Sequence, residues 1–122
     1  MDERARAGER MTRRGIGRGQ TVNEDGSTQW LPDAAVEWLY PDSPPEVALA
    51  AALRLRPQHW RITSERSPVV RRPPATYVRC REDRIIDADW ARSAAPDLVE
   101  LPGDHSPFLA RPAELADLLT GL

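Results

Sequence analysis

The sequence contains no lysine, a single cysteine and no long apolar run, and each absence excludes a class of structure or location. All 17 basic residues are arginine, which we attribute to coding composition rather than function. One cysteine, Cys80, cannot form an internal disulfide. No apolar run approaches the ~20 residues that a bilayer span needs, and the N-terminus has no apolar signal-peptide core. We therefore expect a cytoplasmic protein with no membrane partner.

Length and composition are those of one modest globular domain. The 122 residues are 40% hydrophobic and 30% charged, which argues against disorder of the whole chain. A net charge of −2 gives no reason to expect nucleic acid as a partner. Twelve prolines divide the chain into short elements.

Residues 1–29 form an arginine- and glycine-rich segment with few apolar side chains. Such a segment buries too little surface to offset the cost of ordering its backbone, so we expect a flexible tail. Its glycine-rich part at 15–19 follows no strand and lacks the dinucleotide-binding spacing, so no cofactor is expected there. A basic arm that contacts nucleic acid is the alternative interpretation, although acidic residues dilute the positive charge.

Residues 30–72 have the pattern of a helical segment followed by a loop. Asp33 is placed to cap a short helix over 34–38. A capping-box pattern precedes an alanine- and leucine-rich helix expected over 47–55, which Pro57 ends. The capping box consists of Ser43, Pro44 and Glu46. From position 62 to position 74 the chain is polar and proline-containing, which is typical of a connecting loop.

Residues 73–122 carry the clearest pattern, in which strand and helix alternate. This order is typical of a parallel unit in an α/β fold. Helices cover both faces of parallel sheets, so a two-stranded unit needs further structure around it. The expected elements are a strand over 75–80, a helix over 87–94, a strand over 97–101 and a final helix that Pro112 opens.

Two chemically competent side chains follow the two expected strands. Asp83 comes just after the first strand, and His105 follows the second. Ligands of open α/β sheets bind beyond the carboxyl ends of the strands, so these side chains should share one rim. An aspartate that accepts from one imidazole nitrogen fixes the tautomer, which leaves the other nitrogen to take a proton from a hydroxyl. The two-residue pattern alone would more often describe an inert loop histidine and an exposed acid.

Two stretches resemble the closing segments of α/β-hydrolases. These are 74–84 (Pro-Ala-Thr-Tyr-Val-Arg-Cys-Arg-Glu-Asp-Arg) and 99–109, which contains Gly-Asp-His-Ser-Pro-Phe. They are most similar to the methylesterase and hydroxynitrile-lyase branch of the esterase-like enzymes, and 40–42 and 55–58 resemble the cap region of that branch. The resemblance implies the C-terminal part of an α/β-hydrolase sheet, with its last two parallel strands and flanking helices, preceded by a cap-like segment.

The resemblance also implies a catalytic role for the two rim residues. Asp83 would be the triad acid and His105 the triad base of an esterase, acting on a small ester-like substrate. Aromatic side chains could line its pocket, although core packing is their more frequent role. These aromatic residues are Trp38, Trp60 and Phe108. No cofactor is implied, and a metal site is not expected because the two histidines, His59 and His105, lack ligand spacing.

The sequence departs from the family at the nucleophile. Family members carry their serine on a Gly-x-Ser-x-Gly elbow, and these 122 residues contain no such pentapeptide. We therefore expect a partial esterase that is inactive alone because it is truncated or mis-started. Two alternatives stay open: a partner chain that binds a separate N-terminal half, and a non-catalytic module in which the acid and the histidine are inert.

Overall fold

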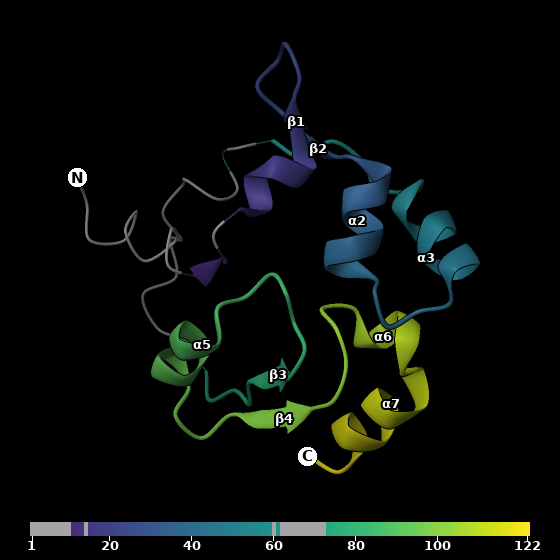
Figure 1. Cartoon of the computed structure of the whole chain (residues 1–122). Helices are drawn as coiled ribbons and strands as arrows, with labels where there is room; N and C mark the ends of the chain where they lie inside the picture. The colour runs from purple at the N-terminus through teal and green to yellow at the C-terminus, as the bar shows by residue number, and fades with distance from the viewer. Residues whose placement is uncertain (1–10, 14, 60, 62–72) are drawn as a thin grey trace, which may run out of the picture.

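The computed structural model describes residues 11–13, 15–59, 61 and 73–122. Short helices and short strands follow one another along the chain (Figure 1). None of the helices in these ranges has both the length and the apolar character that a bilayer span requires. The elements are the 3-10 helix η1 (Ile16–Gly19), β1 (Gln20–Val22), β2 (Thr28–Trp30), α2 (Pro32–Leu39), α3 (Pro45–Ala52), β3 (Val78–Cys80), α5 (Ala88–Ala94), β4 (Val99–Leu101), α6 (Pro107–Ala110) and α7 (Pro112–Thr120).

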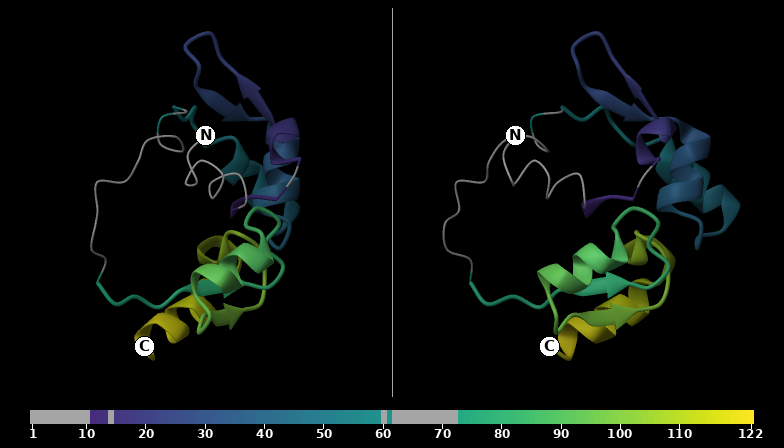
Figure 2. Two further views of the ribbon diagram at one scale, coloured as in Figure 1. Left: turned by 90° about the vertical axis from the view of Figure 1, so that its left-hand side faces the viewer. Right: turned by 60° about the vertical axis from the view of Figure 1, so that its left-hand side comes forward.

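Strands β1 and β2 form an antiparallel hairpin whose tip projects from the rest of the molecule (Figures 1 and 2). Polar side chains of the connection hold it together, because Asn23 Nδ2 donates to Ser27 Oγ at 2.9 Å and Ser27 Oγ donates to Asp25 Oδ1 at 2.6 Å. Gly26 has a φ of +82°, which a glycine adopts without strain. The segment expected to be a flexible tail thus includes η1, β1 and the start of β2.

Helices α2 and α3 lie side by side (Figure 1). Each begins at a proline, Pro32 and Pro45, whose fixed φ and missing N–H suit the first helical position. Because a proline opens each helix, the side-chain caps predicted for α2 and α3 are wrong. Asp33 lies inside the first turn of α2, and Ser43 makes no cap bond to α3. The buried Ser43 hydroxyl has no hydrogen-bond partner among the described residues.

Strands β3 and β4 are parallel neighbours, with Cys80 opposite Leu101 at their carboxyl ends. This confirms the α/β fold class and the predicted pairing. Both strands are shorter than the predicted 75–80 and 97–101, although the ladder extends one bond further because Val99 N donates to the Tyr77 carbonyl at 2.9 Å.

The sheet lies between α5 and α7 (Figure 1). Helix α5 starts where the sequence predicts, because the Asp87 carboxylate caps it by accepting from Trp90 N at 2.9 Å. Helix α7 begins at Pro112, also as predicted, and the short α6 before it was not expected. The segment 11–13 runs beside the chain that follows β3, since Arg13 N donates to the Ile85 carbonyl at 2.8 Å.

The buried apolar side chains fall into two groups, and alanine is the most frequent residue in the larger one. The larger group lies around α2 and α3: Ala35, Leu39, Tyr40, Ala48, Ala52 and Ile85. The smaller group lies at the sheet and α5: Cys80, Ala91 and Leu101. The loops beyond the carboxyl ends of β3 and β4 lie where these two parts of the molecule meet, and they carry the candidate site.

Candidate active site

Asp83 is held in the loop after β3 by backbone donors. Its side chain is buried, and Oδ1 accepts from Ile85 N at 2.7 Å and from Ile86 N at 3.2 Å. These bonds fix the carboxylate within its own loop. The second oxygen, Oδ2, is then free to face the loop that follows β4.

Paired backbone bonds join that second loop to the first. Arg81 N donates to the Leu101 carbonyl at 2.9 Å, which continues the parallel ladder past the strands. Glu82 N donates to the Gly103 carbonyl at 3.0 Å, and Gly103 N donates to Glu82 Oε2 at 2.6 Å. The two loops therefore run together beyond the carboxyl ends of the sheet, which brings the residues that follow them to one rim.

The structure brings Asp83 and His105 together at this rim. Asp83 Oδ2 lies 3.0 Å from His105 Nδ1, although the residues are 22 positions apart. An ionised carboxylate can only accept, so this bond places the imidazole proton on Nδ1 and leaves the lone pair of Nε2 available. The His105 side chain is 36% exposed whereas that of Asp83 is 9% exposed. A buried acid thus holds a base that solvent can reach.

The charge state of Asp83 suits this arrangement. Burial alone would raise the pKa of the Asp83 carboxyl, but the hydrogen bonds from His105, Ile85 and Ile86 outweigh burial and hold the pKa below its ordinary value. Asp83 is therefore ionised at neutral pH. An ionised carboxylate beside the ring stabilises an imidazolium when His105 accepts a proton.

Sequence reasoning assigned no role to Asp104, which lies between the glycine and the histidine of the second loop. Its side chain is 1% exposed, and it accepts from Ser106 N at 2.8 Å and from Asp42 N at 2.9 Å. The only sequence signal was an acid directly before the candidate base. Its partner Asp42 lies 62 positions earlier, so no local pattern could have shown this bond.

The described hydroxyl and thiol groups include no nucleophile for His105. Among the described residues, the Asp83 carboxylate is the one hydrogen-bond partner of the His105 ring. Ser106 is adjacent in sequence but is buried. Cys80 is also buried, and burial, aided by the charge of Asp83, raises its pKa to about 11. A thiol with so high a pKa is a poor nucleophile at neutral pH.

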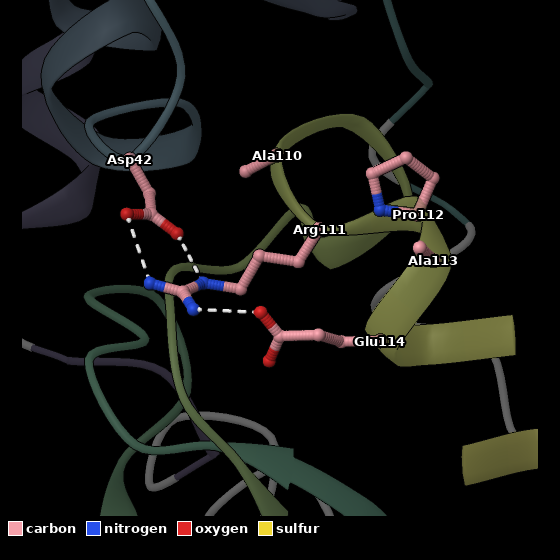
Figure 3. Close-up of a pocket in the computed structure, with 6 residues that line it drawn as sticks. All are labelled: Asp42, Ala110, Arg111, Pro112, Ala113 and Glu114. Carbon is pink, nitrogen blue, oxygen red and sulfur yellow. Dashed lines mark hydrogen bonds and ion pairs between the residues drawn. The ribbon is translucent and has the colours of Figure 1, made fainter. Parts of the chain in front are cut away.

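A surface pocket of about 380 Å³ lies beside this region at the junction of α6 and α7 (Figure 3). Arg111 crosses it to Asp42, with Nε 2.7 Å from Oδ2, and also contacts Glu114 Oε1 at 3.2 Å. Neither Trp38 nor Phe108 lines this pocket or the second one, of about 330 Å³, found in the described part of the chain. Trp60 lies outside the described residues. The aromatic pocket suggested by the sequence therefore stays a prediction.

These features define a class of protein: an α/β fold with an acid–imidazole pair beyond two neighbouring parallel strands. A family model of the alpha/beta hydrolase family matches residues 3–118, so the chain belongs to that family. The match confirms the resemblance at the level of the family and does not distinguish its esterase-like branches. A search of curated proteins found no match to the chain.

Proposed function

We propose that this chain provides the acid–base part of a serine-dependent ester hydrolase. The observation that carries the proposal is the 3.0 Å contact between Asp83 Oδ2 and His105 Nδ1 at the carboxyl ends of β3 and β4. Membership of a hydrolase family supports it. The ester class of substrate rests on the likeness of residues 74–84 and 99–109 to esterase-like enzymes.

The proposed reaction uses His105 twice. A serine hydroxyl attacks the ester carbonyl carbon while its proton passes to His105 Nε2, and the imidazolium then protonates the departing alcohol. Water attacks the acyl-enzyme next, with Nε2 again taking the proton, which releases the acid and restores the serine. Asp83 stabilises the imidazolium in both stages. One ester and one water give one acid and one alcohol.

The serine must come from outside these 122 residues, because they contain no Gly-x-Ser-x-Gly elbow. Either a further segment of a longer chain or a separate polypeptide could supply it. The surface favours such an addition. Within the described part of the chain, β3 and β4 pair only with each other and leave two open sheet edges, which readily recruit further strands. Large apolar side chains are also exposed near the C-terminus, at Phe108 in α6, Leu119 in α7 and Leu122 just after α7.

Ester hydrolysis tests this proposal in two preparations: the 122-residue chain, and a form completed by a segment that carries the Gly-x-Ser-x-Gly elbow. Such a segment could be encoded in frame upstream of Met1 or could co-purify as a second polypeptide. The 122-residue chain should not hydrolyse p-nitrophenyl acetate faster than its own His105→Gln variant. In the completed form, His105→Gln should lower kcat by on the order of 10⁶-fold and Asp83→Asn by on the order of 10⁴-fold.

His59→Gln is the matched control, since it alters the other histidine of the chain. It should retain the hydrolysis rate of the completed form. Hydrolysis by the completed form that His105→Gln leaves unchanged would refute the proposed role of the Asp83–His105 pair.

A further inference from the structure

The most deeply buried large side chain of the described residues is a carboxylate, that of Asp104, at 1% exposure. Burying a carboxylate is costly unless hydrogen bonds or a cation compensate it. Among the described residues Asp104 forms no ion pair, and its bonds to two backbone N–H groups, of Ser106 and Asp42, are the compensation. These two bonds connect the buried side chain to the turn around His105 and to the α2–α3 connection.

The backbone is held on both sides of His105, and the first bond of Asp104 holds one of these sides. Asp104 Oδ1 accepts from Ser106 N at 2.8 Å and so closes a turn around the histidine. On the other side, Gly103 is anchored to Glu82 and has a φ of +106°, which favours glycine. The backbone at His105 is therefore held by hydrogen bonds both before and after the histidine.

The second bond connects this turn to the helical part of the molecule. Asp104 Oδ2 accepts from Asp42 N at 2.9 Å, and Asp42 lies in the connection between α2 and α3. The Asp42 carboxylate in turn holds Arg111, with Nε–Oδ2 at 2.7 Å (Figure 3). Packing around these groups is tight, because a Cβ at position 103 would lie 2.7 Å from Arg111 Nε and 2.8 Å from Asp42 Oδ2.

We propose that Asp104 is a positioning residue, whose two backbone bonds set the orientation of His105 toward Asp83 and couple it to the α2–α3 connection. This inference rests on the proposed function of His105 as the base. Asp104 itself need not touch the substrate. Its role is to keep the imidazole within hydrogen-bond distance of Asp83 while Nε2 faces the reacting groups.

The test compares two variants of the full chain. In Asp104→Asn the side chain keeps its size, but one oxygen becomes an NH₂ group that cannot accept from a backbone N–H. In the matched control, Asp42→Asn, the backbone N–H that Asp104 accepts from is retained and only the pairing with Arg111 is weakened. We expect ¹⁵N NMR to show that Asp104→Asn disturbs the His105 tautomer and its Nδ1 proton signal, and that Asp42→Asn leaves both unchanged. His59 serves as the internal reference.

Amide hydrogen exchange in the unsubstituted chain covers the case in which Asp104→Asn fails to fold. The amides of Ser106 and Asp42 should exchange at least about tenfold more slowly than in the unfolded chain. Unprotected Ser106 and Asp42 amides in the folded protein, or an unchanged His105 tautomer in folded Asp104→Asn, would overturn the proposal.

Kinetics of the completed enzyme separate the positioning role from a merely structural one. Asp104→Asn should lower kcat about 100-fold with little change in KM, as expected for a misplaced base. Asp42→Asn should retain kcat within about threefold. The NMR and exchange results do not depend on turnover. If His105→Gln leaves hydrolysis intact while Asp104→Asn still shifts the His105 tautomer, the proposed function fails and the positioning role stands.

Discussion

Among single residues, Asp83 links the candidate site to stability. Burial opposes its ionisation, yet hydrogen bonds from His105 and two backbone amides lower the pKa of its carboxyl below the ordinary 3.8. A carboxyl with a lowered folded-state pKa adds stability above its unfolded-state pKa and loses that stability as the pH falls through the folded-state pKa. We predict that the stability Asp83 contributes is complete above about pH 5 and declines below about pH 4.

Urea unfolding followed by tryptophan fluorescence at several pH values measures this contribution. Asp83→Asn should reduce the acid-dependent loss of stability below about pH 4. Asp25→Asn is the matched control. The pKa of Asp25 is also lowered, first by its hydrogen bonds with Ser27, but the carboxyl is fully exposed, so its substitution should matter much less. Equal pH profiles for the unsubstituted chain and Asp83→Asn would contradict the prediction.

How far the sequence could predict the site depends on the range of each interaction. Asp83 and His105 each follow a strand, and a parallel pairing brings such positions to one rim, so their proximity was predictable. Asp104 was not, because one of its donors is a backbone amide 62 positions away. Nothing in a local pattern distinguishes a buried acceptor of backbone amides from an exposed acid.

At the level of elements, some helix starts could be predicted from the sequence and others could not. The start of α5 was predicted to within one residue, because the Asp87 carboxylate and Trp90 N that cap it lie three positions apart in one turn. The caps of α2 and α3 were mispredicted because a nearby proline took the first helical position in each case. The hairpin was not predicted because β1 and β2 are only three residues long and their register depends on the turn between them.

A cap substitution tests the energetic difference between these helix starts. Asp87→Ala removes the acceptor of the Trp90 N bond and should lower the free energy of unfolding by about 1 kcal/mol. Asp33→Ala, in the first turn of α2 where no side-chain cap bond exists, should cost less than about 0.5 kcal/mol. Urea titration followed by circular dichroism measures both variants. A loss for Asp33→Ala as large as that for Asp87→Ala would show that the cap bond contributes little.

The molecule as a whole has two thin apolar groups, joined by a polar contact and by a few apolar side chains from the loop after β3 and from α6. Four of the nine buried apolar residues are alanines, at Ala35, Ala48, Ala52 and Ala91, so each group removes little apolar area from water. Ile85 packs with the α2–α3 group, and the bond from Asp42 to Asp104 also crosses between the parts. A chain built in this way should unfold with low cooperativity, because either part gains little from the other.

Cys80 allows this expectation to be measured. Its thiol is 7% exposed, and burial raises its pKa to about 11, so at pH ~8 it should react with iodoacetamide about 100-fold more slowly in the folded sheet than in the unfolded chain. We predict that, on heating, Cys80 labelling rises at a different temperature from the loss of helical circular dichroism, since Cys80 reports on the sheet part alone and the circular dichroism signal also includes α2 and α3. The fully urea-unfolded chain sets the maximal labelling rate. Coincident, sharp and reversible transitions would instead show that the bonds around Asp104 and Arg111 join the two parts into one cooperative unit.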